Sequence, residues 1–467
     1  MKPVTLEEVA RAVGGRPLGR MVVTSIRGVQ TDSRKDCDGR LFFALVGPTH
    51  NGHDHVAEAL NKGAVAAVIS ETQDEGEGAD GHDPGRLIQV ADTVEALGRL
   101  ASWYRRQISA QVIAVVGSCG KTTTKDMIAA VLGARRRGRA AVASFNNAIG
   151  VPLTLLSVEP QDEFVVVEIG TNHAGEVAAL GRIARPNVAV VTSVGEEHLE
   201  FFGDIETVAR EEMSILLCMR ERSCAVINHD AFRFLSTRGQ RQQTVLTYGT
   251  HKDADLRAVD LRVEASGCRF RLNDRFGYRV PLLGGHNAIN ALAAIAIGAR
   301  FRMTDEDMAA GLAAVRPPPM RLERSTIGSV TLINDAYNAN PSSMRTAFDV
   351  MDHLPHHGRK VLVLGDMGEL GEQTERCHRA VGREAGRSTA HVIIAVGRCA
   401  RIVADGATGT AGTSKRIYSI PTVELLSEKI KDLIEPGDVV LLKASRSVRL
   451  ERLVQPLTDA ARVAMAS

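Results

Sequence analysis

The chain has 467 residues and a nearly balanced charge, with Lys+Arg 57 against Asp+Glu 55 and a formal net charge of +2. Hydrophobic residues make up 44% and charged residues 24%, proportions that are typical of a globular protein and argue against disorder. The charge balance also argues against a nucleic-acid binder, which needs a basic excess to contact phosphates. At about 150 residues per domain, the length predicts about three domains.

The cysteines and the apolar runs indicate in which cellular compartment to expect the protein. The chain has seven cysteines that lie apart without a C-x-x-C pair, a pattern that favours a reducing cytoplasm over a disulfide framework. Residues 1–15 lack the apolar core of a signal peptide and predict a short amphipathic helix. The longest weakly polar run, 288–299, is too short to cross a bilayer. We therefore expect a cytoplasmic protein without membrane insertion, and a monomer by default.

The predicted elements follow an α/β pattern along the chain. Residues 1–107 mix helical stretches with short predicted strands at 41–46, 65–69 and 87–90. Apolar strand runs then recur at 112–116, 164–169, 188–191 and 225–227, separated by segments of helical period, and an Ala-rich helix is predicted at 287–300. This alternation predicts a mainly parallel sheet with helices on both faces.

Three consecutive prolines, Pro317 to Pro319, are the strongest break in the chain, because proline cannot continue a helix. Beyond them, predicted strands at 330–333, 361–364, 392–396 and 439–443 alternate with helical segments. That pattern predicts a second doubly wound domain.

The strongest local motif lies at the end of the strand predicted at 112–116. There the chain continues as Gly117-Ser118-Cys119-Gly120-Lys121-Thr122-Thr123, which opens a helix. Backbone N–H groups of such a turn, with the helix N-terminus behind them, bind polyphosphate, while the Lys reaches the phosphates and the Thr binds Mg²⁺. The spacing is G-x-x-G-K-T, which is shorter than the common phosphate-binding loop, so its context has to support it.

Two further side chains follow apolar strands and could complete such a site. Glu168 ends the strand predicted at 164–169, where a buried carboxylate needs a partner or a metal ion. His198 follows the strand at 188–191. By itself Glu168 is equally compatible with a solvated strand end, and His198 by itself would more often be a structural hydrogen-bonding residue. Their proximity to the phosphate loop in the expected sheet favours a metal site.

The order of these motifs resembles the Mur ligases, the ATP-dependent amide-forming enzymes of peptidoglycan synthesis, and among them the member that adds D-alanyl-D-alanine. The resemblance covers nearly the whole chain. It is carried by the segments TDSR (31–34), GRLFFAL (39–45), NGH (51–53), GSCGKTTTK (117–125), NNAIGVP (146–152), VEIGTNHAGE (167–176), EHL (197–199), GHNAINALAA (285–294), MRLE (320–323), NDAYNANPSSM (334–344), GDMGELG (365–371) and KASRS (443–447).

The resemblance implies a domain for each substrate group. Residues 1–107 would form a smaller α/β domain that binds the UDP substrate, and 108–318 a central P-loop-type mononucleotide-binding domain for ATP. Residues 319–467 would form a Rossmann-like domain that closes on ATP and the D-alanyl-D-alanine site. Such enzymes transfer the γ-phosphoryl group of ATP to the carboxylate of UDP-N-acetylmuramoyl-tripeptide, and the amine of D-alanyl-D-alanine then attacks the acyl phosphate.

The resemblance also implies roles for single residues. Lys121 would bind the γ-phosphate and Thr122 a first Mg²⁺, while Glu168 and His198 would hold a second Mg²⁺. The catalytic group is thereby Lys121, Glu168, His198 and Arg321. The nucleotide would contact residues 117–123 together with Asn287, Asn290, Arg321 and Asp335. Substrate binding is assigned to Ser33, Arg34, Asn146, Asn147, Asn338, Asn340 and Ser342, with Ser33 and Arg34 on the uridine-diphosphate part and the last three on the dipeptide side.

One position departs from the family pattern. Many members carry a lysine, carbamylated to an anionic Mg²⁺ ligand, in a helix after the His198 region, whereas no Lys occurs here between Lys125 and Lys252. Glu212 stands where that lysine is expected. Our hypothesis is that Glu212 supplies the negative oxygen directly, and the opposing interpretation is a solvated helix charge.

Two other interpretations stay open at the level of sequence. Folylpolyglutamate synthase shares the ATP domain and the acyl-phosphate chemistry, but the segments 31–45 and 337–341 speak against it. A non-catalytic nucleotide-binding partner is disfavoured because Lys121, Glu168, His198, Arg321 and Asp335 occur together. Cys119, which a helix N-terminus could activate, is interpreted as a small residue tolerated in the loop.

Overall fold

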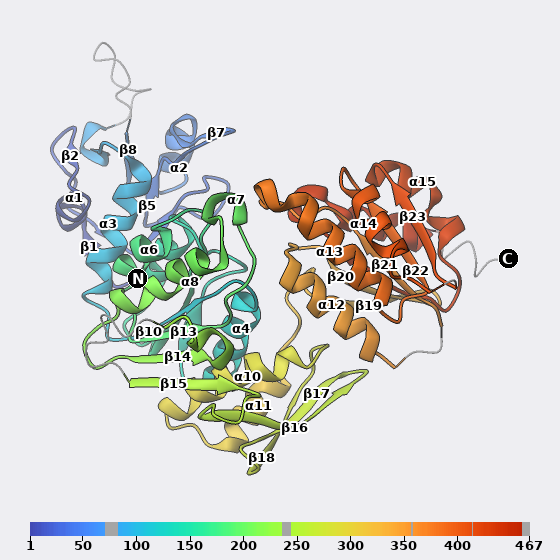
Figure 1. Ribbon diagram of the computed structural model, residues 1–467. Coiled ribbons are helices and arrows are strands. Elements are labelled where there is room, and N and C mark those ends of the chain that lie inside the picture. The colour runs from blue at the N-terminus through green and yellow to red at the C-terminus, as the bar shows by residue number, and fades with distance from the viewer. Residues whose placement is uncertain (71–82, 236–243, 356–357, 413, 460–467) are drawn as a thin grey trace.

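The computed structural model describes residues 1–70, 83–235, 244–355, 358–412 and 414–459. Figure 1 shows a body made of the N-terminal segment (blue) and the central segment (cyan to yellow), with the C-terminal segment (orange to red) beside it. Each segment contains its own main β-sheet. The predicted class, α/β with three domains and mainly parallel sheets, is confirmed.

The N-terminal segment is built on a sheet of strand order β2-β9-β8-β5-β4, in which all pairs are parallel except β2 with β9. The strand predicted at 41–46 ends at Phe43, because the chain turns there and Val46 pairs with Asn51 instead. The elements are β1 (Val4–Thr5), α1 (Leu6–Val13), β2 (Arg16–Pro17), β3 (Ser25–Ile26), β4 (Gly28–Gln30), β5 (Arg40–Phe43), β6 (Val46–Gly47), β7 (His50–Asn51), η1 (Gly52–His55), α2 (Val56–Asn61), β8 (Ala66–Ile69), η3 (Pro84–Arg86), β9 (Leu87–Gln89) and α3 (Thr93–Arg105).

Helix α3 joins the N-terminal segment to the central one. It packs against α1 on one side and against α5 and α6 of the central segment on the other. Its side chains belong to one hydrophobic core that continues from the N-terminal sheet to the central sheet. The buried Tyr104 hydroxyl donates to the Val158 carbonyl oxygen at 2.7 Å, and Arg105 Nε donates to the Ala184 carbonyl oxygen at 2.7 Å. The first two segments are therefore packed as one unit.

The central sheet has the order β11-β12-β10-β13-β14-β15-β16-β17-β18 and is parallel from β11 to β16. The predicted parallel sheet is confirmed, whereas the antiparallel extension β16 to β18 was not predicted. The elements are β10 (Gln111–Val116), α4 (Lys121–Gly133), β11 (Gly138–Ala140), α5 (Gly150–Leu156), β12 (Phe164–Glu168), α6 (Glu176–Ala184), β13 (Val188–Val191), α7 (Leu199–Phe202), α8 (Ile205–Met213), η4 (Ser214–Cys218), β14 (Cys224–Asn228), α9 (His229–Phe232), β15 (Thr244–Gly249), β16 (Leu256–Glu264), β17 (Gly267–Leu272), β18 (Phe276–Val280), α10 (His286–Arg300) and α11 (Asp305–Ala313).

Strands β10, β12, β13 and β14 of the central sheet are apolar on both faces because helices cover both. Alternate side chains of β10 illustrate this, since Val112, Ala114 and Val116 enter the core shared with α5 and α6, while Ile113 and Val115 pack against α4 and α10. A strand buried on both sides reads as a continuous apolar run. That is the pattern by which these strands were predicted.

The C-terminal sheet has the order β19-β20-β24-β21-β22-β23, parallel except for β19 with β20. Helices α12, α13 and α14 cover one face and α15 the other, so the predicted doubly wound arrangement is confirmed. The elements are β19 (Glu323–Ile327), β20 (Val330–Asp335), α12 (Pro341–His353), β21 (Lys360–Leu364), η5 (Gly371–Gln373), α13 (Thr374–Arg387), β22 (Val392–Val396), α14 (Ala400–Thr408), β23 (Arg416–Ile420), α15 (Val423–Leu433), β24 (Val439–Lys443), η6 (Arg446–Val448) and η7 (Leu450–Leu453).

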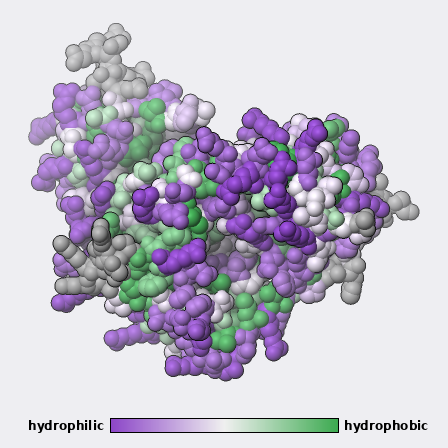
Figure 2. All heavy atoms as spheres, in the orientation of Figure 1, coloured by the Kyte–Doolittle hydropathy of each residue, from purple (hydrophilic) through white to green (hydrophobic). Residues whose placement is uncertain are grey.

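The segment ends predicted at 107/108 and 318/319 fall in the connections between α3 and β10 and between α11 and β19. In the view of Figure 2, hydrophilic residues dominate the C-terminal segment, while apolar residues reach the surface in patches over the other two. Among the described helices, none is both long enough and apolar enough to cross a membrane.

Candidate active site

A cavity of about 560 Å³ lies between the central and C-terminal segments. It brings together residues that are far apart in the chain, and most of the predicted site residues line it. These are Ser118, Cys119, Gly120, Lys121, Thr122, Thr123, Asn146, Asn147, Glu168, His198, Asn287, Asn290, Arg321, Asp335, Asn338, Asn340 and Ser342. Four predicted residues lie outside this lining: Gly117, Glu212, Ser33 and Arg34.

The phosphate loop, residues 117–123, connects β10 to α4, and two of its positions require glycine. Gly117 has φ +123°, and a Cβ there would lie 2.4 Å from Thr192 Oγ1. Gly120 has φ +83°, and a Cβ there would lie 2.8 Å from Asn290 Oδ1 of α10. Only glycine adopts a left-handed backbone with such close neighbours at little cost. Both glycines are thus explained by the packing of the loop.

The end of strand β13 holds the phosphate loop in place. The backbone N–H of Ser118 donates to the Ser193 carbonyl oxygen at 3.0 Å, and the N–H of Cys119 donates to Ser193 Oγ at 2.8 Å. Helix α4 starts at Lys121, so its first backbone N–H groups have no partner within the helix and face the cavity as the positive end of the helix dipole. This arrangement is suited to an anion such as polyphosphate.

Glu168 occupies the carboxyl end of β12, beside the phosphate loop. Glu168 pairs with Val115 of the parallel strand β10, so both strands end at the same edge of the sheet. The carboxylate is 1% exposed, and Oε1 accepts a hydrogen bond from Asn146 Nδ2 at 3.0 Å. Its other oxygen, Oε2, is buried without a hydrogen-bond partner. A buried charged oxygen of this kind is costly unless a ligand pairs with it.

His198 lies at the corresponding end of β13, just before α7, with φ +49°. Its Nδ1 lies 2.5 Å from Glu369 Oε2 of the C-terminal segment, and its Nε2 lies 3.8 Å from Glu197 Oε2. Glu197 is buried, lines the cavity, and has an Oε1 without a hydrogen-bond partner. The strand end thus presents an imidazole and a second carboxylate to the cavity.

Lys121 is the cation at the centre of these acids. Its ammonium group contacts the Gly117 carbonyl oxygen and lies 4.0 Å from Glu197 Oε2. Burial opposes the charge of Lys121, but the neighbouring Glu197, Glu212 and Glu168 outweigh it and raise its pKa. Three carboxyl groups surround this one ammonium group, and a further cation would favour their ionised forms.

Glu212 lies beneath the phosphate loop, outside the cavity lining. It is fully buried on α8, and its Oε2 accepts the backbone N–H of Gly117 at 2.7 Å. Burial and, to a smaller extent, Glu197 raise the pKa of Glu212, against the opposing effects of Lys121 and the Gly117 N–H. The structure therefore contradicts the interpretation of Glu212 as a solvated charge, while its role as a metal ligand stays a prediction.

The acids offer oxygen atoms of the kind that a divalent cation binds. Buried oxygens without partners on Glu168, Glu197 and Glu212 are the hard donors that Mg²⁺ prefers, and the Thr122 hydroxyl lines the same cavity. Glu168 ends β12 and Glu197 follows β13, the two strands that flank β10, while Thr122 lies in the first turn of α4 and Glu212 in α8.

Asn287 and Asn290 lie on the same face of α10, as their spacing predicts. Asn290 Nδ2 donates to Asn287 Oδ1 at 3.1 Å, and Asn287 Nδ2 donates to the Leu283 carbonyl oxygen at 2.8 Å. The bond between the two amides fixes the orientation of Asn290, whose amide lies against Gly120.

Arg321 reaches the cavity from the first turn of the C-terminal segment. Its guanidinium lies over the Tyr337 ring, 4.1 Å from the ring centre, and Nη2 donates to Ser144 Oγ of the central segment at 3.3 Å. Stacking on the ring holds the planar cation in one orientation. Ser144 Oγ in turn lies 3.2 Å from Thr122 Oγ1, which places Arg321 close to the phosphate loop.

The segment Asn338 to Ser342 brings the C-terminal segment to the phosphate loop. Asn340 caps α12 through its Oδ1, which accepts the Ser343 N–H at 2.8 Å, and its amide also contacts Cys119 Sγ at 3.5 Å. Burial raises the pKa of the Cys119 thiol, the opposite of what a reactive thiolate needs. Cys119 is thus a packing residue between the two segments.

Ser33 and Arg34 belong to the N-terminal segment and lie apart from the cavity. Ser33 is buried and donates to Glu58 Oε2 at 2.7 Å, whereas Arg34 is exposed and pairs with Asp32 at 2.8 Å. The Arg34 side chain and its backbone N–H lower the pKa of Asp32 to about 2.

Several cavity residues were not singled out from the sequence. Glu197, Lys443, His286, Tyr337 and Ser144 all line the cavity. Glu197 directly precedes His198 at a strand end, and Lys443 is the last residue of a predicted strand, so both had the same positional signal that indicated Glu168. Ser144 and His286 carry no such signal.

Family models match the chain in three successive parts. The model described as "Mur ligase family, catalytic domain" matches residues 25–105, "Mur ligase middle domain" matches 115–298, and "Mur ligase, glutamate ligase domain" matches 320–446. Together they account for most of the chain.

Full-length relatives agree with these matches. The UDP-N-acetylmuramoyl-tripeptide–D-alanyl-D-alanine ligase of Bacillus subtilis is 36% identical over 438 residues, which is 93% of this chain and 94% of that protein. The crystal structure of MurF from Acinetobacter baumannii superposes with a TM-score of 0.86 at 28% identity, covering 98% of this chain and 99% of that one. MurF ligase from Thermotoga maritima in complex with ADP gives 0.78 at 26% identity, covering 94% and 98%. The chain therefore belongs to the Mur ligase family.

Proposed function

We propose that this chain is an ATP-dependent ligase that joins D-alanyl-D-alanine to the free carboxylate of UDP-N-acetylmuramoyl-tripeptide in peptidoglycan synthesis. The observation that carries the proposal is that the phosphate loop and the segment Asn338 to Ser342 line one cavity from two different segments. The names of the full-length relatives supply the substrates. The products would be the UDP-N-acetylmuramoyl-pentapeptide, ADP and phosphate.

ATP would bind with its phosphates on the loop at residues 117–123. The first N–H groups of α4 would donate to phosphate oxygens, and Lys121 would move from the Gly117 carbonyl oxygen to the γ-phosphate. Asn287, Asn290 and Asp335 would contact the nucleotide, with Arg321 closing over the phosphates from the C-terminal segment. The ADP complex of the Thermotoga maritima relative supports nucleotide binding by this fold.

Mg²⁺ is the proposed metal cofactor. Thr122, Glu168, His198 and Glu212 would hold it, and the unpartnered oxygens of Glu168 and Glu212 support this assignment. When bound, Mg²⁺ supplies positive charge that neutralises the phosphate oxygens during phosphoryl transfer. Glu212 could serve only at the back of the loop, where its Oε2 already accepts the Gly117 N–H.

The reaction needs an activated carboxyl group, because a carboxylate is a poor electrophile. Its oxygen would attack the γ-phosphorus of ATP, the bond to the β-phosphate oxygen would break, and ADP would leave. The dipeptide amine would then attack the acyl carbon, lose a proton, and expel phosphate as the amide forms. Lys121 and Arg321 would stabilise the negative charge in both steps, and closure of the C-terminal domain over the cavity would keep water from the acyl phosphate.

The remaining substrate groups are assigned to the outer parts of the molecule. Ser33 and Arg34 of the N-terminal domain, residues 1–107, would bind the uridine diphosphate. Asn146 and Asn147 would contact the tripeptide, and Asn338, Asn340 and Ser342 the dipeptide, with 108–318 as ATP domain and 319–467 as closing domain. Because α3 shares a core with the central segment, the uridine and ATP sites would keep a fixed spacing.

The enzyme is proposed to act in the cytoplasm as a monomer. All seven cysteines carry free thiols, which supports a reducing compartment. The substrates and the consumption of ATP support the same compartment, and the pentapeptide product would serve growth of the cell wall during elongation and division.

The test is phosphate release from ATP by the purified full-length chain. We expect release that requires both UDP-N-acetylmuramoyl-tripeptide and D-alanyl-D-alanine, with formation of the pentapeptide measured by mass spectrometry. Release that needs neither substrate, or that needs a folate and glutamate instead, would contradict the proposal. An absence of release under all conditions, with ATP still bound, would favour the non-catalytic binding partner.

A further inference from the structure

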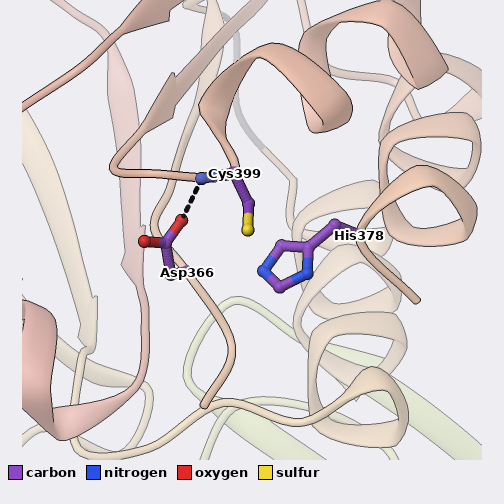
Figure 3. Close-up of side chains that lie close together, drawn as sticks. All are labelled: Asp366, His378 and Cys399. Carbon is purple, nitrogen blue, oxygen red and sulfur yellow. Dashed lines mark hydrogen bonds between the residues drawn. The ribbon is translucent and has the colours of Figure 1, made fainter. Parts of the chain in front are cut away.

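Asp366, His378 and Cys399 form a cluster of potential metal ligands outside the cavity (Figure 3). Its hydrogen bonds show that it is structural. His378 Nε2 accepts the Met367 N–H at 2.9 Å while Nδ1 donates to the Thr374 carbonyl oxygen at 2.7 Å, so neither ring nitrogen is free for a metal. Asp366 accepts the N–H groups of Arg398 and Cys399 at 2.9 Å each. The cluster fixes the loop at residues 366–371 on the C-terminal sheet.

This loop presents Glu369 to the central segment in one defined position. The Gly368 N–H donates to Ser445 Oγ at 2.7 Å, so the loop is held on both sides of its tip. Glu369 itself has φ +58°, a left-handed conformation at which the side chain leaves the loop toward the neighbouring segment. Its carbonyl oxygen accepts the Glu200 N–H at 3.1 Å, which anchors the loop to α7, the helix that follows His198.

The Glu369 carboxylate contacts His198 directly. Its Oε2 lies 2.5 Å from His198 Nδ1, and the His198 side chain is 13% exposed. A carboxylate only accepts hydrogen bonds, so the contact places the proton on Nδ1. In the neutral ring the lone pair is then on Nε2, the atom on the side of Glu197 and the cavity. A histidine that ligates a metal commonly has its other nitrogen bonded to a carboxylate in this way.

We propose that Glu369 is a positioning residue that orients His198 as a metal ligand, so that the C-terminal domain completes the metal site when it docks on the central domain. The inference rests on the Mg²⁺ site of the proposed function. It explains why a metal ligand of the ATP domain is held by a side chain of the domain that closes over ATP. ATP and metal ion would therefore be bound most tightly in the docked arrangement.

Other contacts keep the two segments together without Glu369. Arg345 and Arg376 of the C-terminal segment both lie near Glu196, at 3.5 and 3.2 Å, and Leu199 of α7 packs into the C-terminal core. Removing the charge of Glu369 should therefore leave the docking intact. Arg376→Gln removes one charged contact of the same interface without touching His198, and Arg345 still faces Glu196, so it is the matched control for the loss of an interface contact. Glu372→Gln, an exposed position in the same region, controls for the lost charge.

The first measurement is the tautomer of His198 at one fixed alkaline pH. Full-length chain labelled with ¹⁵N-histidine would be compared with Glu369→Gln by long-range ¹H–¹⁵N correlation, with His198→Gln used to assign the signal. We expect the Nδ1–H tautomer in the unmodified chain and a mixture of both tautomers in Glu369→Gln. Arg376→Gln and Glu372→Gln should keep the Nδ1–H tautomer. Identical His198 signals in the unmodified chain and Glu369→Gln would overturn the proposal.

The second measurement is the affinity for Mn²⁺, used as a spectroscopic substitute for Mg²⁺, by electron paramagnetic resonance in the presence of ADP. We expect Glu369→Gln to bind Mn²⁺ at least about tenfold more weakly, and both controls to bind it within about twofold. Equal weakening in Arg376→Gln would overturn the proposal, because the loss of any charged contact between the two segments would then account for the effect. Neither measurement uses the tripeptide or the dipeptide, so failure of the ligase assignment would be seen separately, in the phosphate-release assay.

Discussion

Lys443 Nζ lies 2.6 Å from Asp335 Oδ2, at the ends of two neighbouring parallel strands, β24 and β20. The two residues are register partners, so the sheet itself brings the ion pair together. The Lys443 side chain is 2% exposed, and it also donates to the Asn338 carbonyl oxygen at 3.2 Å. Asp335 Oδ1 accepts the Leu322 N–H. One ion pair thus links Asp335, the proposed nucleotide contact, to the segment Asn338 to Ser342, which is proposed to bind the dipeptide.

Lys443→Met should destabilise the C-terminal domain and raise the KM for ATP. Removing one partner of a buried pair leaves the other charge uncompensated, which costs roughly 3 kcal/mol. Thermal unfolding of the full-length chain and the KM for ATP are the measurements. Lys431→Met, at an exposed position of α15, is the control and should change neither. An unchanged unfolding temperature in Lys443→Met would show that the pair contributes nothing to stability.

Lys121→Met should abolish most of the catalytic rate. The substitution keeps the length of the side chain but removes the cation that faces Glu197 and the γ-phosphate position. We expect phosphate release with both substrates to fall by about 100-fold or more, a loss comparable to that of a charge-stabilising donor in other enzymes. Lys252→Met, at an exposed position, should retain the full rate. A fall of less than about threefold would remove Lys121 from the catalytic group.

Glu212→Gln should raise the Mg²⁺ concentration that half-saturates the reaction by about tenfold, because Gln cannot supply an anionic oxygen to the proposed metal site. Glu211→Gln is a closely matched control, since Glu211 is the neighbouring buried carboxylate and accepts the N–H groups of Gly175 and Val177 at 2.8 Å each. The control should lose stability without changing the Mg²⁺ dependence. If Glu212→Gln keeps full activity with the same Mg²⁺ dependence, the metal role of Glu212 is wrong.

His286 should make the chain less stable in acid. Burial, with a smaller effect of Lys443, lowers the pKa of His286 from 6.5 to about 4, and its buried Nδ1 has no hydrogen-bond partner. The unfolded chain therefore takes up a proton below pH 6.5 that the folded chain takes up only near pH 4. Stability from this group is complete above about pH 6.5 and falls as the pH is lowered toward 4, by about 2 kcal/mol between pH 7 and 5.

The measurement is urea unfolding followed by the fluorescence of Trp103, the single tryptophan. His286→Asn should lose about 2 kcal/mol less stability than the unmodified chain between pH 7 and 5. The comparison of the two proteins cancels the carboxyl groups that titrate in the same range. Parallel stability profiles would exclude His286 as the titrating group.

The residues that strands carry to the edges of the parallel sheets could be predicted from the sequence. Glu168, His198 and Lys121 all follow apolar runs buried on both faces, and a parallel sheet gathers such ends at one edge. The pairing of Asn287 with Asn290 likewise follows from helical spacing. These predictions use only periodicity and strand direction, which the local sequence encodes.

What could not be predicted depends on contacts between distant segments. The strands β16 to β18 alternate exposed and buried residues and are interrupted by a bulge between Val259 and Arg262, so they give no continuous apolar run. The contact of Glu369 with His198 spans 171 positions in the sequence and exists only because two domains dock. No local pattern at either residue indicates the other.

The continuous core around α3 has a consequence for cooperative unfolding. Tyr104 and Arg105 are hydrogen-bonded to the central segment, and their helix packs on both sheets. The border near residue 107 therefore separates two family matches but does not separate two independently stable units. Differential scanning calorimetry should show the first two segments absorbing heat in a single transition, with the C-terminal segment melting separately. A fragment ending at residue 107 would expose the apolar flank of α3 to water and should aggregate rather than fold.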